Sequence, residues 1–369
     1  MKLFQIDRDA LLKPLQAVSG IVEKRHTLPI LSNVLIRRKQ GNLSFIATDL
    51  EIQVSTACEE LEGGGDEVAF TVSARKLQDI LRALPDGTVT TLDLQNSRLQ
   101  VRAGKSRFNL QTLPANDFPT LADPGTQLGS VRLGQGELRE LLALVQYSMA
   151  QQDIRYYLNG LLLVLEEDRI KLVATDGHRL SYMGGQIGQQ SQKSEVILPR
   201  KAVLELAKLL EPSDAAVEVE IYATQAKFRF GTVELVTKLI DGKFPDYTRV
   251  IPVNYEKRIS LDRIVLLQAL QRAAILSNEK FRGVRWMLTA NSLRISCTNN
   301  EQEEAQEELE VEYGGEALDV GFNINYLLDV LNYVDEPTVD CAFGDANSSM
   351  LMTVPERKEF KYVVMPMRI

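Results

Sequence analysis

The pattern of apolar and polar positions in residues 77–84 recurs at 203–210 and again at 327–334. Each segment carries apolar residues at its first, fourth and eighth places and an acidic residue at its third. This spacing is typical of an α-helix that buries one stripe of its surface. The sequence therefore predicts the same helix three times, at offsets of 126 and 124 residues.

Two further sets of segments repeat with nearly the same period. The short runs 45–49, 172–176 and 295–299 are β-like and end in Thr-Asp or Thr-Asn, and each follows a turn-like stretch and another apolar run. This order predicts a β-hairpin in each repeat. The third set is an amphipathic helix at the start of each repeat, over residues 8–19, 137–149 and 261–276. Pro14 lies inside the first of these helices and should kink it or remove a hydrogen bond.

Three tandem repeats, each ordered helix, strands, helix, strands, account for the whole chain and predict an α+β protein. Turn-forming residues interrupt the pattern near 123–126 and 252–254, which places the repeats at 1–124, 125–252 and 253–369. Loosely similar helices occur in any α+β chain. That alternative is disfavoured because three independent sets of segments keep one register.

The composition restricts the class of protein. With 369 residues, 44% of them hydrophobic and 25% charged, the chain is typical of folded proteins of two or three domains. No stretch has the length of a signal peptide or a membrane span, so we expect a cytoplasmic chain with no membrane attachment. Three cysteines without a CxxC spacing and only two histidines predict neither a disulfide framework nor a metal site.

Motifs for catalysis and cofactor binding are missing from the repeats. The stretch Gly104-Lys105-Ser106 resembles the end of a P-loop, but Leu99 stands where the first glycine is required. We therefore predict no cofactor and no catalytic residue. An enzyme whose site is assembled from unrelated loops stays open as an alternative.

The net charge of −8 argues against binding nucleic acid through overall charge. The six predicted helices, taken over 8–19, 75–84, 137–149, 200–210, 261–276 and 325–334, nevertheless contain 11 Lys or Arg and 7 Asp or Glu. If all six lie on one side of the sheets, that side is basic and attracts a phosphate backbone. The alternative is that these charges only keep helix surfaces solvated.

Five stretches of the chain resemble one known family: 155–160 (RYYLNG), 174–180 (ATDGHRL), 243–247 (KFPDY), 274–285 and 362–368. They closely resemble the bacterial sliding clamps, the beta subunits of DNA polymerase III, in the same order and over the whole chain. The resemblance implies repeats of two helices backed by antiparallel sheet, and a head-to-tail dimer ring with pseudo-sixfold symmetry around duplex DNA. It further implies a non-catalytic processivity factor that holds DNA without regard to sequence, with the clamp loader and the replicative polymerase among its partners.

A head-to-tail ring needs two complementary ends. An acidic run in the third repeat and basic residues on a strand of the first repeat suit this role, with apolar residues beside each. Without the ring, the acidic run would be interpreted as a solvated edge that discourages aggregation. The predicted interface residues are Lys76, Lys105, Arg107, Phe108 and Leu110 at one end, and Ile275, Leu276, Glu301, Glu303 and Glu304 at the other.

The resemblance also implies a pocket for partner peptides, with adaptable Met and Val walls. Its residues are Leu158, Thr175, Gly177, His178, Arg179, Leu180, Pro245, Arg249, Val250, Val363, Met365, Pro366, Met367 and Arg368. The terminal methionines could instead be ordinary core residues, and His178 could be only a turn residue.

For DNA contacts the family points to basic, Tyr and Gln side chains that meet phosphates or exposed bases. These are Arg25, Arg75, Gln152, Tyr156, Tyr157, Arg200 and Lys201. If Tyr156 and Tyr157 lie on a strand, they point to opposite faces and only one reaches DNA. The alternative function is a repeat-built interaction scaffold that uses the same pocket without encircling DNA.

Overall fold

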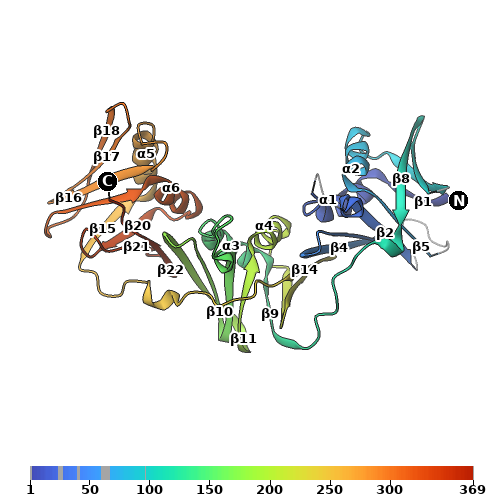
Figure 1. The fold of residues 1–369 in the computed structure, drawn as a ribbon, viewed down its shortest axis with the longest axis horizontal. Coiled ribbons are helices and arrows are strands. Elements are labelled where there is room, and N and C mark those ends of the chain that lie inside the picture. The colour runs from blue at the N-terminus through green and yellow to red at the C-terminus, as the bar shows by residue number, and fades with distance from the viewer. Residues whose placement is uncertain (1, 24–27, 40–41, 60–66, 96, 369) are drawn as a thin grey trace. The chain divides into compact units, whose positions relative to one another are not determined.

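The computed structural model describes residues 2–23, 28–39, 42–59, 67–95 and 97–368 (Figure 1). Within these ranges the α-helices are α1 (Arg8–Ser19), α2 (Ala74–Ala83), α3 (Gln135–Gln146), α4 (Arg200–Leu209), α5 (Arg263–Ala274) and α6 (Ile324–Tyr333). Every one of them lies within three residues of its predicted bounds. The short 3₁₀ helices are η1 (Pro29–Ser32), η2 (Ala115–Asp117), η3 (Tyr156–Leu158) and η4 (Tyr247–Arg249).

Most strands pair in antiparallel fashion with the strand that comes next in the sequence. The strands that precede α3 are β1 (Lys2–Asp7), β2 (Asn33–Lys39), β3 (Asn42–Thr48), β4 (Ile52–Glu59), β5 (Val68–Ser73), β6 (Val89–Gln95), β7 (Arg98–Ala103), β8 (Ser106–Pro114) and β9 (Gln127–Gly134). The next five are β10 (Gly160–Thr175), β11 (Arg179–Pro199), β12 (Ala216–Tyr222), β13 (Gln225–Phe230) and β14 (Val233–Lys238). The last eight are β15 (Lys257–Asp262), β16 (Gly283–Thr289), β17 (Ser292–Thr298), β18 (Glu304–Glu310), β19 (Leu318–Asn323), β20 (Thr338–Phe343), β21 (Met350–Val354) and β22 (Arg357–Val364).

The chain divides into two compact units, each described here by itself. Residues 1–138 and 204–239 form one unit, whose twelve-stranded sheet has the order β1-β6-β7-β8-β5-β2-β3-β4-β14-β13-β12-β9. Residues 139–203 and 240–369 form the other. It contains a six-stranded sheet, β10-β11-β22-β21-β20-β15, and a four-stranded sheet, β18-β17-β16-β19.

Local chemistry explains why helices begin where they do. The side chains of Asp7, Ser73, Asp262 and Asn323 each accept a hydrogen bond from a backbone N–H in the first turn of the helix that follows. Such caps satisfy donors that have no partner inside the helix. The predicted helix over 8–19 is confirmed with Pro14 inside it, where the proline ring is buried with the apolar stripe.

The Thr-Asp and Thr-Asn sites form equivalent turns in the three repeats. The Asp49 carboxylate accepts from the backbone N–H of Ile52 at 2.7 Å, and the Asp176 carboxylate accepts from that of Arg179 at 3.0 Å. Asn299 accepts in the same way from Glu303 at 2.9 Å. A short side chain that bonds the backbone two to four residues ahead closes such a turn. The repeat read from the sequence is therefore a repeat of turn geometry.

Two of the three predicted hairpins correspond to antiparallel pairs. β2 pairs with β3 and β16 with β17. In the middle of the chain β10 is one long strand, and its register with β11 shifts on both sides of Glu167, where φ is 56°. The turn-like stretch before the run 172–176, Glu167 and Asp168, falls at this irregularity. Both halves of β10 pair with β11, so the hairpin predicted for the second repeat is wrong and its segments form one strand.

Two antiparallel pairings join segments that are far apart in the sequence. β4 pairs with β14, with Val54 opposite Leu235, and β11 pairs with β22, with Leu180 opposite Val363. In both cases the strand after the Thr-Asp turn meets the last strand of the following repeat. This recurring pair of strands places the end of β22 beside the Asp176 turn.

Each group of strands covers a buried apolar core. Trp286 is the largest fully buried side chain and contacts Phe322 edge-on, with ring centroids 5.8 Å apart. Leu327, Val330 and Leu331 of α6 are buried in the same cluster. α1 packs on α2, and α5 packs on α6. Among the described residues, no helix has the length and hydropathy needed to span a bilayer.

Candidate functional site

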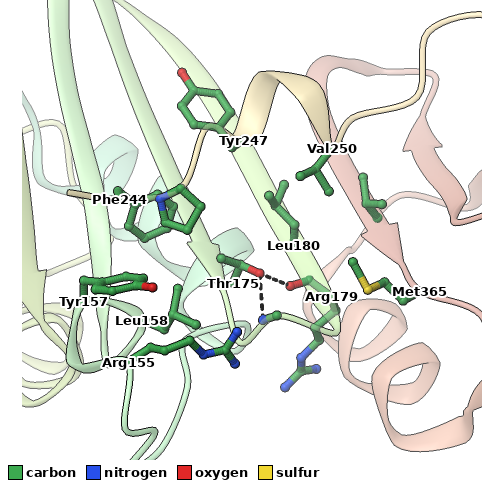
Figure 2. Close-up of a pocket in the computed structure, with 13 residues that line it drawn as sticks. Arg155, Tyr157, Leu158, Thr175, Arg179, Leu180, Phe244, Tyr247, Val250 and Met365 are labelled. Carbon is green, nitrogen blue, oxygen red and sulfur yellow. Dashed lines mark hydrogen bonds between the residues drawn. The ribbon is translucent and has the colours of Figure 1, made fainter.

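A cavity of about 170 Å³ lies in the second compact unit, where the Asp176 turn meets the end of β22 (Figure 2). Four segments supply its walls: η3, the turn between β10 and β11, the segment from Phe244 to Val250, and the end of β22. Its lining residues are Arg155, Tyr157, Leu158, Thr175, Gly177, Arg179, Leu180, Phe244, Pro245, Tyr247, Val250, Val363 and Met365.

The walls are mainly apolar and preformed. Leu158, Leu180, Phe244 and Val363 are buried, so their positions are determined by the core beneath them. Met365 is 43% exposed and stands at the rim. A concave apolar site with a few polar groups suits the apolar side chains of a ligand.

Hydrogen bonds within the turn hold its rim. The Thr175 hydroxyl donates to the Arg179 carbonyl at 2.6 Å and accepts from the Gly177 N–H at 3.0 Å, as Figure 2 shows. The Asp176 carboxylate accepts from the His178 N–H at 2.9 Å. The turn is therefore rigid, and it presents the backbone of Gly177 to the cavity.

Arg155 forms the polar edge of the cavity. Its Nη2 donates to Oδ2 of Asp153 at 2.9 Å and to the Asp176 carbonyl at 3.3 Å. The hydrogen bonds from Arg155 lower the pKa of Asp153 to about 2. The hydrogen bond to the Asp176 carbonyl connects the loop before η3 to the turn.

Gly177 is required at this turn for two reasons. Its φ is 88°, a conformation that costs an L-residue about 1–2 kcal/mol, and an added Cβ would lie 2.9 Å from the Arg155 guanidinium. We expect Gly177→Ala to lower the free energy of unfolding by about 1–3 kcal/mol in denaturant titrations. Gly231→Ala is a matched control, because φ there is 53° and nothing lies within 4 Å of the added Cβ. Equal losses in the two variants would contradict a role for the Arg155 contact.

The structure brings most of the predicted pocket residues together. Nine of them line the cavity: Leu158, Thr175, Gly177, Arg179, Leu180, Pro245, Val250, Val363 and Met365. Five do not line it: His178, Arg249, Pro366, Met367 and Arg368. The His178 carbonyl accepts from the Met365 N–H at 2.9 Å, so this residue supports the rim. Met367 and Arg368 line a separate cavity of about 550 Å³ with Phe281 and Cys297.

Sequence reasoning missed four lining residues: Arg155, Tyr157, Phe244 and Tyr247. All four lie in stretches that carry the family resemblance, 155–160 and 243–247, so their positions were available as a signal. For Tyr157 the family resemblance implied a DNA contact, and a strand at this point would have directed Tyr156 and Tyr157 to opposite faces. Both residues are in the 3₁₀ helix η3, where Tyr156 is 58% exposed and Tyr157 faces the cavity.

The predicted DNA-contact residues lie in different environments. Gln152 is exposed, with φ at 57°. Arg75 is exposed and lies 3.8 Å from Asp79. Arg200 is half-buried and donates to the Met149 carbonyl at 3.0 Å; burial, aided by repulsion from Arg179, lowers its pKa. Lys201 is half-buried, and Arg25 lies outside the described residues.

The predicted interface residues lie on β8 and in the turn before it, at the start of α2, just after α5, and just before or at the start of β18. Lys105 is in the turn between β7 and β8, which corrects its predicted place on a strand, and Arg107 is exposed on β8. Phe108 is half-buried and Leu110 is buried. Ile275, just after α5, is 77% exposed. Lys76, Glu301, Glu303 and Glu304 are exposed, and Leu276 is half-buried.

In the part of the chain that the structure describes, Cys58, Cys297 and Cys341 form no disulfide bond. There, no group of three or more His, Cys, Asp and Glu side chains is arranged to hold a metal ion. Cys297 and Cys341 are buried free thiols, and burial raises the pKa of Cys297 to about 11.

Repeated α+β units joined by one recurring strand pair, with an apolar cavity at one junction, define a clamp-type repeat protein. Family models of the DNA polymerase III beta subunit match in order: the N-terminal domain at residues 1–122, the central domain at 132–246 and the C-terminal domain at 248–368. The chain belongs to this family, the bacterial sliding clamps, and its function is that of a processivity clamp for DNA polymerase.

Individual relatives agree over the full length. The beta sliding clamp of Pseudomonas putida is 45% identical and aligns over 99% of this chain and 100% of its own. A crystal structure of the Pseudomonas aeruginosa sliding clamp with ligand has a TM-score of 0.96 at 44% identity, with complete coverage of both chains. Another structure of that clamp, bound to griselimycin, has a TM-score of 0.95 at 45% identity and complete coverage of both chains. The alternative of a scaffold that does not encircle DNA is not favoured.

Proposed function

We propose that two copies of this chain close head to tail into a ring around duplex DNA, and that the cavity at the Asp176 turn binds peptide segments of the polymerase and the clamp loader. Within the ring, each copy contributes three repeats, 1–124, 125–252 and 253–369. The chain acts in the cytoplasm, as a non-catalytic subunit.

The strand pairing supports a head-to-tail contact. β4 with β14 and β11 with β22 use the same two strands of consecutive repeats. Two strands hold the same positions in their repeats but take part in neither pairing: β18, which follows the Asn299 turn in the third repeat, and β8, the last strand of the first repeat. Among the described strands β18 pairs only with β17, and Ser106–Gln111 of β8 pairs only with β7. A third pairing of this kind, between β18 of one copy and β8 of another, closes the ring, and this observation carries the proposal.

Charge and apolar surface at these strands are complementary. Exposed Glu301, Glu303 and Glu304 lead into β18, whereas exposed Lys105 lies in the turn just before β8 and exposed Arg107 lies at the start of β8. Ion pairs at the rim of an interface steer association, and apolar contacts supply most of the affinity. Ile275 and Leu276 opposite Phe108 and Leu110 provide the apolar contact. Lys76 adds a further positive charge.

A ring explains how an acidic protein stays on DNA. A closed ring leaves its template only by opening or by sliding off an end, so persistence needs few phosphate contacts. Weak, mobile contacts also favour sliding, and base-specific contacts would hinder it. Arg75, Gln152 and Tyr156 are the exposed members of the proposed DNA contacts among the described residues, and Arg25, Tyr157, Arg200 and Lys201 complete the set.

The cavity suits a short peptide with apolar anchors. Each buried Leu or Phe side chain contributes about 1.5–3 kcal/mol. Two or three anchors, less the cost of ordering the peptide, give a dissociation constant of about micromolar. Such affinity allows partners to exchange on one clamp. His178, Arg249, Pro366, Met367 and Arg368 extend the peptide site beyond the cavity itself.

Retention on circular DNA tests the ring. The purified chain is loaded by a clamp loader and ATP onto a nicked circular plasmid, and the bound fraction is measured by gel filtration. We expect the clamp to remain on the circle and to leave within minutes when a restriction enzyme cuts the plasmid. Equal loss from circular and linear DNA would contradict encirclement and favour a scaffold that does not surround DNA.

A further inference from the structure

Arg179 lines the cavity but does not offer its charge to it. Its side chain is only 9% exposed, and Figure 2 shows the guanidinium directed away from Thr175 and Leu180. Nη1 donates to Asp329 at 2.5 Å, and Nη2 donates to the Tyr147 carbonyl at 2.7 Å. Nε donates to Asp176 at 3.2 Å. All three nitrogens of the guanidinium are therefore engaged inside the protein.

The environment keeps this group charged. Burial alone would lower the pKa of Arg179, but the hydroxyl of Tyr362 and the carboxylates of Asp329 and Asp176 outweigh burial and raise it above the ordinary value. The guanidinium carbon also lies 4.5 Å from the centroid of the Tyr326 ring, in cation–π contact. A peptide carboxylate could bind this guanidinium only by displacing partners that are already in place.

The partners of Arg179 belong to the turn at the cavity and to helix α6. Asp176 is in the turn that carries Thr175, Gly177 and Leu180. Asp329 and Tyr326 are on α6. Asp329 lies 150 residues after Arg179 in the sequence.

α6 is in turn joined to the opposite wall of the cavity. The Tyr362 hydroxyl donates to the Tyr326 carbonyl at 2.8 Å, which links α6 to β22. Val363 and Met365, the next residues along that strand and its extension, form the wall. The backbone N–H of Met365 donates to the His178 carbonyl, next to Arg179.

We propose that Arg179 and Asp329 form a latch that positions the turn against α6 and the end of β22, so that Arg179 determines peptide affinity through the shape of the cavity and not through contact with the peptide. Arg179 is thus a positioning residue. The inference rests on the proposed peptide function of the cavity.

A double-mutant cycle tests the latch, because Asp329 does not line the cavity. The readout is the fluorescence anisotropy of a fluorescein-labelled peptide that carries adjacent Leu and Phe anchors. We expect Asp329→Ala and Arg179→Lys each to weaken binding about tenfold, and the double variant to be no weaker than either single variant. Asp329→Glu, which keeps the carboxylate, should recover part of the affinity. Asp335→Ala is the matched control, since it removes an exposed carboxylate just beyond α6.

Three results would overturn the latch: unchanged binding by Asp329→Ala, additive losses in the double variant, or equal losses in Asp335→Ala. Thermal unfolding curves identify a variant that fails to fold. In that event the second measurement is the chemical shift of the Met365 methyl group in Asp329→Glu, recorded without added peptide. If the wall is displaced, this resonance should shift from its position in the original chain. Met365→Glu separates the two proposals: if it leaves peptide binding unchanged, the peptide function of the cavity fails. If it abolishes binding while Asp329→Ala does nothing, only the latch fails.

Discussion

Joint replacement of Ile275→Ala and Leu276→Ala should convert the ring into folded monomers at micromolar concentration. Ile275 is 77% exposed in the single chain, so its loss removes little from the core. Burial of the two side chains against a second copy is worth about 3–6 kcal/mol at each contact, which corresponds to a factor of at least a hundred in dissociation constant. Sedimentation equilibrium measures the mass directly.

Helix α5, which ends just before Ile275, offers a control for this prediction. Ile264 and Val265, at the beginning of α5, are also exposed apolar residues. Ile264→Ala with Val265→Ala removes similar apolar surface away from the proposed contact and should leave the dimer intact. A dimeric Ile275→Ala, Leu276→Ala variant at micromolar concentration would remove these residues from the interface, and the pairing of β18 with β8 would then need another apolar contact.

Deletion of Met365 to Ile369 should abolish binding of the polymerase and the clamp loader while the ring stays dimeric. Met365 forms one rim of the cavity, and its backbone N–H is bonded to the His178 carbonyl. Without this wall the apolar anchors of a peptide stay in contact with water, so we expect a loss of affinity of at least about a hundredfold. Surface plasmon resonance with immobilised polymerase, together with the native mass of the variant, measures both properties.

A point variant distinguishes the wall from the rest of the tail. Met365→Leu keeps a flexible apolar side chain of similar volume, and its affinity should stay within about threefold of the original. Normal binding by the truncated chain would contradict the assignment of the cavity. Loss of dimerisation on truncation would instead show that the tail, through Met367 and its neighbours Phe281 and Cys297, supports the interface.

The helices illustrate what can be predicted from local sequence. The stripe Leu11, Leu15 and Val18 and the cap at Asp7 lie within one short segment, so the helix over 8–19 needs no distant information. The equivalent turns at Asp49 and Asp176 are local in the same sense, because each carboxylate bonds the backbone a few residues ahead. Lys105 was misplaced because only the pairing of β7 with β8 shows where the turn between them lies.

The cavity could be predicted in part only. The turn residues and Met365 lie in stretches recognised from the family, but Tyr157 and Tyr247 enter the cavity from short 3₁₀ helices that periodicity does not reveal. Residues that share a stretch can also separate: Met365 lines this cavity, whereas Met367, two positions later, lines another.

The sequence by itself determined the threefold repeat, the type and order of the helices and the family, because periodicity, capping residues and turn residues act over a few positions. Only the tertiary structure decided which side chains meet. The engagement of Arg179 with Asp329 and the pairing of β11 with β22 join residues well over a hundred positions apart. Contacts over such separations depend on how whole elements pack, and no local pattern specifies that packing.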